Sequence, residues 1–445
     1  MRRLKILQCL VFYLPNRIGG IEVYVHSLNL SLLKKGHDVK VVVPNYPGEK
    51  PYAKDHEGVP VVSYTEFQNE TKAGFEGDVA GKSLPGFIDI LKQEKPDVVH
   101  FHQLTNSNGI SIFHMQVARE LGIKVFYTNH LAGLTCTTGK MVYREKQVCD
   151  GIMREVKCAV CDLKKYEIKE AVAWGMVQFG AGISSFLPDY TDSKLMQLLT
   201  YSKRIARKKK RVKALFELVD RFIVITDWYH RVLQLNGIKT DKIRVIKQGL
   251  PLGDTLSDQR SNNPSATQIR LIFIGRIFPE KGLLVLLEAL EGIDEGAYSL
   301  DIYGQVDDEE YFKRCEKIYK DKANISYHGY INSKEIVNTI GNYDVLVLPS
   351  MIAEMAPLVI REAFAANVPV IGTAIGGISE EVKDQENGLL FEMGDVKALN
   401  GILKRLINDK GLLKRLTENV EKPTSFEVIA DQVEQEYQAI CFSTT

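Results

Sequence analysis

The stretch RLIFIGRIFPEKG, from Arg270 to Gly282, decides the fold of the second half of the chain. An apolar strand pattern leads into Gly275 and a turn that carries two cations, Arg276 and Lys281, and the helical pattern LLVLLEAL follows. A buried strand that feeds a helix through a short turn is the repeating unit of a parallel α/β sheet. Helix amides and cationic side chains at such a turn suit an anion such as a diphosphate. Taken alone, the segment is equally consistent with a solvated arginine and lysine in a loop.

The same alternation of strand and helix extends in both directions from this stretch. Further strand patterns in the second half are Ser299–Gly304, Asn324–Gly329, Tyr343–Pro349 and Val368–Gly372. In the first half, strands are predicted at Lys5–Phe12, Asp38–Pro44, Pro96–His102, Lys124–His130, Arg221–Thr226 and Ile243–Gly249, with a helix at Ile21–Lys35. Short Val-rich strands alternating with helices indicate a parallel sheet covered on both faces. We therefore predict two doubly wound, Rossmann-like α/β domains, with a ligand site in the cleft where strand ends of the two domains face each other.

The length of 445 residues suggests two or three domains at roughly 150 residues each. The polar segment Ser257–Thr267 is typical of an interdomain linker. The predicted organisation is a first domain over 1–250, a linker over 251–268, a second domain over 269–425 and a C-terminal helix over 426–445 that packs back on the first domain. Within the first domain, about 135–165 forms a cysteine-bearing insert and about 194–219 a basic helix.

Composition excludes several classes of protein. The net charge of +1 argues against nucleic acid as the main partner, because nucleic-acid-binding proteins usually carry a clear basic excess. No secretory signal is evident at the N-terminus, and no stretch is long and apolar enough to span a membrane. The uncharged segment Ala171–Pro188 is interpreted as buried or interfacial. The seven cysteines are not spread like a disulfide framework, so a reducing, cytoplasmic location is expected.

The stretch EMAPLVIRE places two glutamates, Glu354 and Glu362, eight positions apart. Glu354 follows a predicted strand in a loop, and Pro357 is a natural first-turn residue, so 358–366 should be helical. Glu362 then lies on an apolar helix face, where a buried carboxylate needs a partner. The two hydroxyls of a ribose are well suited, since both can donate to the carboxylate. Spacing alone, however, favours two ordinary surface glutamates.

Five motifs in order resemble the large family of retaining GT-B glycosyltransferases that includes bacterial phosphatidylinositol mannosyltransferases and sucrose-phosphate synthases. The motifs are GGIE at Gly19–Glu22, His130 after a strand, GRIFPEKG at Gly275–Gly282, EMAPLVIRE at Glu354–Glu362, and GGISEEV with NGLLF within Gly376–Phe391. Almost the whole chain is covered, and each motif lies at an expected strand end. The resemblance implies a GT-B fold and transfer of a hexosyl group from a UDP-, GDP- or ADP-sugar to a glycan or lipid-linked acceptor, as in cell-surface polysaccharide or glycolipid biosynthesis.

The resemblance also implies a role for each motif. The expected catalytic residues are His130, Glu354, Arg276 and Lys281. The expected donor-binding residues are Gly19, Gly20, Gly275, Arg276, Lys281, Glu354, Met355, Ala356, Pro357, Leu358 and Glu362. Among them, Arg276 and Lys281 should bind the diphosphate, Glu362 the ribose and Glu354 the sugar hydroxyls, with help from backbone amides of 355–358.

In the first domain, the Gly19 and Gly20 amides should face the donor phosphate, and His130 should lie near the transferred sugar. The family needs no divalent metal at the diphosphate, and its leaving phosphate assists deprotonation of the acceptor. We therefore assign no general base and no glycosidase-type nucleophile. The chain departs from the family at Met355 and Ala356, where many members have Gly-Phe or Gly-Leu.

Other functions remain open at this stage. A nucleotide-sugar epimerase or a phosphorylase would keep the fold, and a non-catalytic sugar-nucleotide-binding module would keep the binding site. The glutamate pair argues against the epimerase, and the intact cationic turn argues against lost activity. A dehydrogenase is disfavoured because no G-x-G-x-x-G follows the first strand.

Four cysteines, Cys136, Cys149, Cys158 and Cys161, have the spacing C-x(12)-C-x(8)-C-x(2)-C. The final C-x-x-C is the usual close pair of a zinc knuckle, and two further thiolates would complete a tetrahedral structural zinc site. Some members of the family carry a similar insert. Free buried cysteines, or a redox-active C-x-x-C, are the alternatives.

The segment Lys203–Lys213 holds eight cations in eleven residues. Such a stretch is more often a solvated face, although it can also bind an anionic membrane surface. Peripheral contact of the protein with the inner face of the membrane is therefore an open prediction.

Overall fold

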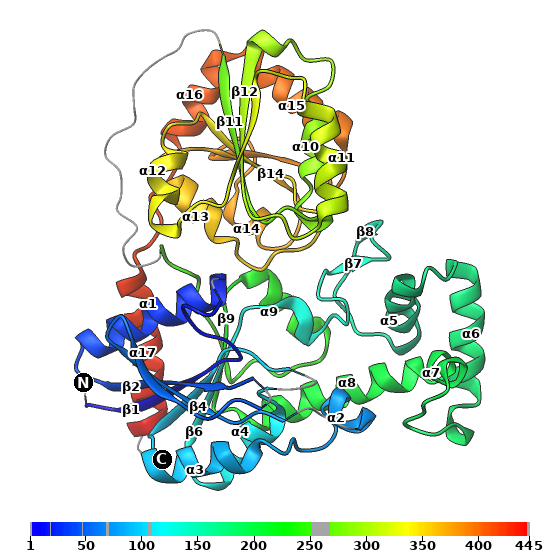
Figure 1. Ribbon diagram of the computed structural model, residues 1–445, viewed down its shortest axis with the longest axis vertical. Coiled ribbons are helices and arrows are strands. Elements are labelled where there is room, and N and C mark those ends of the chain that lie inside the picture. The colour runs from blue at the N-terminus through cyan, green and yellow to red at the C-terminus, as the bar shows by residue number, and fades with distance from the viewer. Residues whose placement is uncertain are drawn as a thin grey trace. The chain divides into compact units, whose positions relative to one another are not determined.

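The computed structural model describes residues 2–17, 19–46, 48–67, 71–105, 109–250 and 268–442. The chain forms two compact α/β units (Figure 1). Unit 1 comprises Met1–Arg144, Cys149–Lys247 and Phe426–Thr445, and unit 2 comprises Glu145–Val148 and Gln248–Ser425. Except for residue 268, the predicted linker over 251–268 lies outside the described residues.

Unit 2 contains a six-stranded, all-parallel sheet in the order β13-β12-β11-β14-β15-β16. The strands are β11 (Ile269–Ile274), β12 (Tyr298–Tyr303), β13 (Ile325–Gly329), β14 (Val345–Leu348), β15 (Val370–Thr373) and β16 (Gly388–Phe391). The helices are α10 (Leu283–Ala289), α11 (Glu309–Tyr319), α12 (Ile336–Ile340), α13 (Leu358–Ala365), α14 (Ile378–Glu381), α15 (Val396–Asn408) and α16 (Lys410–Glu418). The strand order reverses between β11 and β14, and a doubly wound sheet binds its ligand at the carboxyl ends of the strands at such a point.

Unit 1 contains an eight-stranded sheet in the order β10-β9-β6-β5-β1-β2-β4-β3, in which β3 alone of the described strands is antiparallel. The strands are β1 (Lys5–Cys9), β2 (Asp38–Pro44), β3 (Ala53–His56), β4 (Val59–Tyr64), β5 (Val98–Phe101), β6 (Lys124–Asn129), β9 (Arg221–Val224) and β10 (Ile243–Val245). The helices beside them are α1 (Gly20–Lys34), α2 (Lys72–Glu76), α3 (Leu84–Glu94), α4 (Ile112–Glu120) and α9 (Asp227–Leu235). Here the order reverses between β1 and β5, so the segments after these strands diverge.

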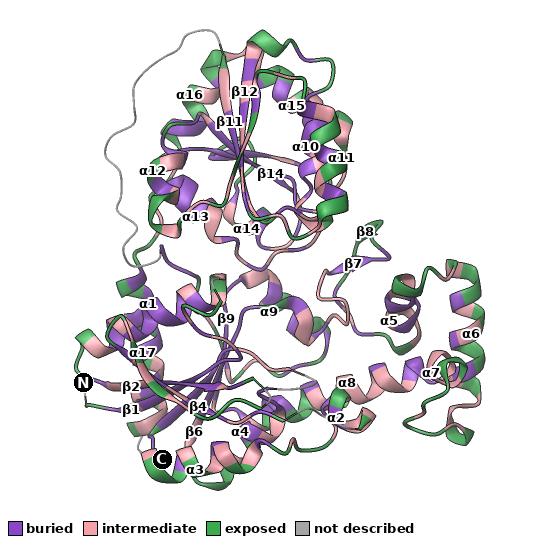
Figure 2. Cartoon of the chain, viewed as in Figure 1, coloured by how far each residue is buried: buried purple, intermediate pink, exposed green. Residues whose placement is uncertain are grey.

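The central strands of both sheets are buried on both faces, as Figure 2 shows. In β5, for example, all four residues are buried, and the same holds for β14. Near-continuous apolar strands are typical of parallel sheets covered by helices on both sides. The predicted fold class, two Rossmann-like α/β domains of the GT-B type, is thus confirmed.

The C-terminal helix α17 (Phe426–Phe442) belongs to unit 1. The Phe426 ring lies 5.1 Å from the Tyr24 ring of α1, and Tyr437 lies 4.8 Å from Phe126 of β6. His37 Nε2 and Glu434 Oε1 are 2.9 Å apart, and both side chains are buried. The helix therefore contributes to the same hydrophobic core as α1.

A helical insert in unit 1 begins with the last two cysteines of the cysteine segment, which lie on its first helix. It contains α5 (Glu155–Asp162), α6 (Glu170–Gly182), α7 (Lys194–Leu199) and α8 (Tyr201–Leu218), with a small core of its own. The segment 171–188, predicted to be buried or interfacial, is only partly buried: Ala173, Val177 and Gly180 are buried, whereas Phe179 is 62% exposed and Phe186 is 87% exposed. Within the described ranges, every helix is too short or too polar to cross a bilayer.

The packing of α17 leads to a first prediction. Replacement of Phe426 by Ala should lower the free energy of unfolding by about 3–5 kcal/mol, because a fully buried ring is lost from the core. Val428 on the same helix is 44% exposed, so Val428→Ala serves as the matched control and should change the stability little. Denaturant titration of both variants measures the difference, and equal stabilities would contradict the assignment of α17 to the core.

Candidate functional site

Two loops at the carboxyl ends of β11 and β14 are locked together in unit 2. The amide of Met351 donates to the Glu280 carbonyl at 2.8 Å. Gly282 has φ +72°, and a Cβ there would lie 1.9 Å from the Pro349 carbonyl oxygen. Only glycine fits this position, because a side chain would collide with the neighbouring backbone and a positive φ strains other residues. The GRIFPEKG turn and the EMAPLVIRE loop are therefore one structural element.

The centre of this element is an ion pair between Lys281 and Glu354. Lys281 Nζ donates to Glu354 Oε2 at 2.7 Å, and the two side chains are only 19% and 13% exposed. The Ser350 hydroxyl donates to the other carboxylate oxygen of Glu354. Two residues that the sequence assigns to one ligand are thus in direct contact, although 73 positions separate them.

Arg276 lies at the same end of β11. Its Nη1 donates to Asp307 Oδ2 at 2.8 Å, and its guanidinium lies 4.8 Å from the centre of the Phe278 ring. The side chain remains 60% exposed, so an incoming anion can reach it. A guanidinium held by one carboxylate and one ring still has free N–H donors for a phosphate.

The loop between the glutamates is fixed by a pair of glycines after β15. The amide of Gly377 donates to the Glu354 carbonyl at 2.7 Å, and a Cβ at Gly377 would lie 1.8 Å from the Met355 carbonyl oxygen. Neither Met355 nor Ala356 is among the described non-glycine residues with positive φ. The departure from the family pattern at these two positions therefore introduces no backbone strain. Pro357 and Leu358 continue the loop into α13, as predicted.

Glu362 lies on α13, and only 7% of the residue is exposed. Its burial agrees with the expectation of a carboxylate on an apolar helix face. Gly275 directly follows β11, next to Arg276. The six predicted positions from Glu354 to Glu362, together with Gly275, Arg276 and Lys281, thus all belong to unit 2, at the carboxyl end of its sheet.

The remaining predicted residues belong to unit 1, where His130 ends a buried chain of hydrogen bonds. His130 Nε2 lies 3.1 Å from His102 Nδ1, and His102 Nε2 lies 2.7 Å from Gln8 Oε1. Burial lowers the pKa of His130 to about 3, so its imidazole is neutral at physiological pH. His130 Nδ1 is buried without a hydrogen-bond partner among the described residues, which leaves this atom for a ligand.

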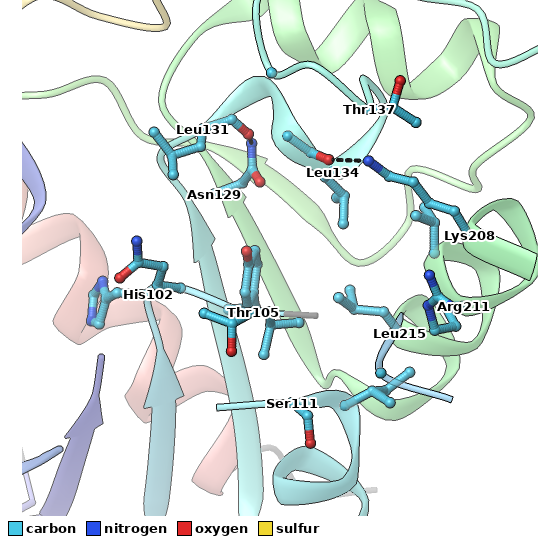
Figure 3. Close-up of a pocket in the computed structure, with 18 of the residues that line it drawn as sticks. His102, Thr105, Ser111, Asn129, Leu131, Leu134, Thr137, Lys208, Arg211 and Leu215 are labelled. Atoms are coloured by element: carbon cyan, nitrogen blue, oxygen red, sulfur yellow. Dashed lines mark hydrogen bonds between the residues drawn. The ribbon is translucent and has the colours of Figure 1, made fainter. Parts of the chain in front are cut away.

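A cavity of about 330 Å³ lies beside this chain, within unit 1. Its wall includes His102 and Asn129, with Lys208 and Arg211 of α8 on the opposite side, where Lys208 contacts the 133–139 loop (Figure 3). Lys208 Nζ donates to the Gly133 carbonyl at 2.6 Å, and burial lowers the pKa of its ammonium to about 8. Polar and basic side chains therefore line this cavity together with apolar ones.

Gly19 and Gly20 begin α1, directly after the loop that follows β1. Gly19 is the N-cap residue with extended backbone, and its carbonyl accepts from the Val23 amide at 3.0 Å. A Cβ at Gly19 would lie 2.7 Å from a carboxylate oxygen of Glu22, so a larger residue would displace that side chain. The expected amide-rich helix start is therefore present.

The basic stretch of α8 is not a free cationic face. Arg207 and Arg211 form ion pairs with Glu76 and Asp78, and Lys203 pairs with Asp189 at 2.8 Å. These ion pairs fix α8 to the segment around α2. The charge run thus has a structural role, which its composition alone does not reveal.

One further group of ligand-type side chains occurs among the described residues. His26, His56 and Glu57 have potential donor atoms within 4.8 Å of one another. Tyr13 OH lies 2.8 Å from His26 Nδ1, and Glu57 lies 3.3 Å from its Nε2. These contacts account for the group without a metal ion.

Several residues of these sites were not predicted from the sequence. Asp307 and Ser350 hold Arg276 and Glu354, and His102 and Lys208 line the cavity in unit 1. Asp307 follows a strand end that the sequence did locate, which was a usable signal. The roles of Ser350, His102 and Lys208 depend on contacts with residues that are distant in the sequence.

Two models of known protein families match this chain, one in each half. Residues 254–423 match the family model "Glycosyl transferases group 1", and residues 18–154 match "Glycosyltransferase Family 4". An uncharacterized glycosyltransferase of Methanocaldococcus jannaschii is 22% identical and aligns with 92% of this chain and 90% of that protein. The putative colanic acid biosynthesis glycosyltransferase WcaL of Escherichia coli is 28% identical over 51% of this chain and 58% of its own.

Two solved structures show the same fold over nearly the whole chain. Sucrose-phosphate synthase from Thermosynechococcus elongatus has a TM-score of 0.69 at 20% identity and covers 99% of this chain and 100% of its own. Anabaena HepE in complex with UDP and glucose has a TM-score of 0.62 at 14% identity and covers 98% of this chain and 100% of its own.

The buried histidines lead to a prediction on pH. Burial lowers the pKa values of His100, His102 and His130 below the ordinary value of about 6.5. Below that value the unfolded chain binds protons that the folded state excludes. Stability of unit 1 should therefore fall as the pH falls from about 6.5, by about 1.4 kcal/mol per pH unit for each histidine.

Denaturant titrations at pH values from neutral to acidic test this dependence. His130→Asn should reduce the pH dependence of the free energy of unfolding by the contribution of one histidine, about 1.4 kcal/mol per pH unit. The exposed His328 of unit 2 provides the control, and His328→Asn should leave the slope of unit 1 unchanged. An unaltered slope in His130→Asn would contradict burial of a neutral imidazole at this position.

Proposed function

Since this chain is a glycosyltransferase with the GT-B fold and a group 1 domain, we propose that it moves a hexosyl group from a nucleotide-diphosphate sugar, with retention of configuration, to a glycan or lipid-linked acceptor. The observation that carries the proposal is the Lys281–Glu354 ion pair at the switch point of unit 2, with the exposed Arg276 at the same strand end.

In this proposal the donor's diphosphate binds by exchange of partners. Lys281 and Arg276 leave Glu354 and Asp307, in whole or in part, and pair with the phosphate oxygens. Glu354 then accepts hydrogen bonds from sugar hydroxyls, while Glu362 accepts from the ribose. Arg276, Lys281 and Glu354 each have a partner before and after binding, which avoids the cost of a bare buried ion.

The two cations also act on the chemical step. As the sugar–phosphate bond breaks, negative charge grows on the leaving diphosphate, and fixed cations stabilise that charge more than they stabilise the ground state. A divalent metal is not required for this role. The leaving phosphate accepts the proton of the acceptor hydroxyl, and neither glutamate forms a covalent intermediate.

His130 is proposed to contact a hydroxyl of the transferred sugar. Two observations support this role: its imidazole is neutral, and Nδ1 has no partner among the described residues. A neutral ring nitrogen positions a hydroxyl without adding charge. For Gly19 and Gly20 we propose the role that the family resemblance implies, which is contact with the donor phosphate through backbone amides.

Relatives suggest the biological setting. WcaL is named for colanic acid biosynthesis, and CapM of Staphylococcus aureus, 25% identical over 50% of this chain, for capsular polysaccharide biosynthesis. We propose that this protein likewise acts in cell-surface polysaccharide or glycolipid synthesis, in the cytoplasm. HepE, whose structure contains UDP, supports a nucleotide-sugar donor. A same-fold epimerase or a non-catalytic binding module remains the alternative.

A panel of nucleotide sugars tests the central claim. The true donor, at 100 times its dissociation constant, should stabilise the protein by about 2.7 kcal/mol, which thermal denaturation detects. Lys281→Ala should slow transfer by a factor that corresponds to about 2–4 kcal/mol of barrier, because a cation at the leaving group is lost. Lys313→Ala, on the outer face of α11, is the matched control and should keep full activity.

The proton NMR spectrum of the first product, recorded before anomers equilibrate, should show the donor's anomeric configuration. An inverted product would contradict retention but leave glycosyl transfer intact. Absence of any shift in melting across the panel would contradict donor binding itself, and isomerised donor without transfer would support the epimerase.

We also propose peripheral contact with an anionic membrane through the helical insert of unit 1. Several cations of α8 are paired within unit 1, so the supporting observation is the exposure of Phe179 and Phe186. Liposomes with anionic lipid should carry the wild-type protein upward in flotation at low salt, and Phe186→Ser should reduce this fraction. Leu235→Ser, an exposed apolar residue of α9, is the control. Absence of flotation of the wild type would contradict the proposal.

A further inference from the structure

Four cysteines from three separate segments of unit 1 line one small cavity. Cys136 follows a turn after β6, Cys149 follows the hairpin of β7 (Val142–Tyr143) and β8 (Gln147–Val148), and Cys158 and Cys161 lie on α5. The last two are three positions apart, so they share a helix face. The cavity measures about 20 Å³, which is room for about one water-sized particle.

Backbone amides are directed at three of the four sulfur atoms, and a hydroxyl contacts the fourth. The Arg144 amide lies 3.3 Å from Cys161 Sγ, and the Arg154 amide lies 3.4 Å from Cys158 Sγ. The Gly151 amide interacts with Cys149. The Thr138 hydroxyl lies 3.3 Å from Cys136 Sγ. Donors aimed at sulfur favour the thiolate over the thiol.

Gly151 shows that this arrangement is built into the backbone. Its φ is +74°, and a Cβ there would lie 2.7 Å from Met141 and 2.8 Å from Val232. Glycine is therefore required, and it allows the turn Cys149-Asp150-Gly151 to direct its amide back to the sulfur.

The four sulfurs gathered at this cavity belong to free cysteines. As thiolates they would repel one another. A divalent cation resolves this conflict, because it replaces the protons and neutralises the charge.

We propose that Cys136, Cys149, Cys158 and Cys161 bind one Zn²⁺ ion as four thiolates. Each thiol releases its proton as its sulfur coordinates, so full ligation releases four protons to solvent. Four soft sulfur ligands select zinc or an iron–sulfur cluster, and the cavity size favours a single ion. Among the described residues no three of these sulfurs lie within 4.8 Å of one another, so zinc binding draws them together.

The metal has a consequence for the neighbouring 330 Å³ cavity. Gly133, Leu134, Thr137, Thr138 and Gly139 line that cavity, and Cys136 lies in the middle of this segment. Lys208 Nζ donates to the Cys136 carbonyl at 3.0 Å as well as to Gly133. The zinc and Lys208 thus fix the same wall from two sides. If the cavity receives the acceptor, which rests on the proposed function, the metal governs acceptor affinity and not donor affinity.

The test begins with metal content, measured on full-length protein purified without chelator. Elemental analysis should give about one zinc per chain, and Cys136→Ser should lower this ratio several-fold. Cys441→Ser is the matched control, since Cys441 is a half-buried cysteine outside the cluster, and it should keep its zinc. Replacement of zinc by Co²⁺ in the wild type should give the intense visible bands of tetrahedral thiolate coordination.

The outcomes separate this proposal from the proposed function. Metal-free wild-type protein whose four cluster thiols titrate freely, or a disulfide between Cys158 and Cys161, would overturn the zinc site. With zinc confirmed, hydrogen exchange of residues 133–139 should rise several-fold in Cys136→Ser and stay unchanged in Cys441→Ser. Neither measurement uses donor or acceptor, so inactivity of the zinc-loaded protein would count against the glycosyltransferase proposal alone.

Discussion

The donor side of the protein depends on one constraint, the hydrogen bonding of β11 to both β12 and β14. Because β14 is the parallel neighbour of β11, loops that are far apart in the sequence emerge side by side at one sheet edge. Lys281 and Glu354 meet at 2.7 Å only for this reason. Gly282 makes the approach close enough, since its missing side chain is the space that the Pro349 carbonyl occupies. A register shift of one residue would separate the charges and turn their side chains away.

Both cations of this edge are already paired before a ligand arrives. This arrangement differs from an open basic pocket, which would attract any phosphate. In the proposed exchange of partners, an anion must compete with Asp307 and Glu354 for the two cations, and a sugar hydroxyl must replace the ammonium at Glu354. The proposal therefore requires a ligand that carries a diphosphate and a sugar together. Unit 1 contains three buried histidines, His100, His102 and His130, whose pKa values burial lowers, so they carry no net charge. His102 and His130 are within hydrogen-bond distance of each other.

Much of the fold was predictable because buried parallel strands are apolar and end at glycines or prolines. Strands such as Asp38–Pro44 were predicted with the observed bounds. The hairpin of β3 and β4 was missed, since its exposed first strand, AKDH, lacks an apolar pattern. The segment 171–188 is partly buried and partly exposed, and its apolar composition does not reveal which residues a small insert leaves exposed. Within the site, the motif residues lie at strand ends as the sequence predicted, whereas Ser350 and His102 act through tertiary neighbours that no local pattern encodes.

The return of α17 to unit 1 has a consequence for how the protein is made. Unit 1 lacks part of its core until Phe426 and Tyr437 have been synthesised, whereas the sheet of unit 2 is complete at β16, some distance earlier in the chain. The segment that is translated first is therefore finished last. On the ribosome, the sheet of unit 2 can therefore form while unit 1 still lacks the buried side chains of α17.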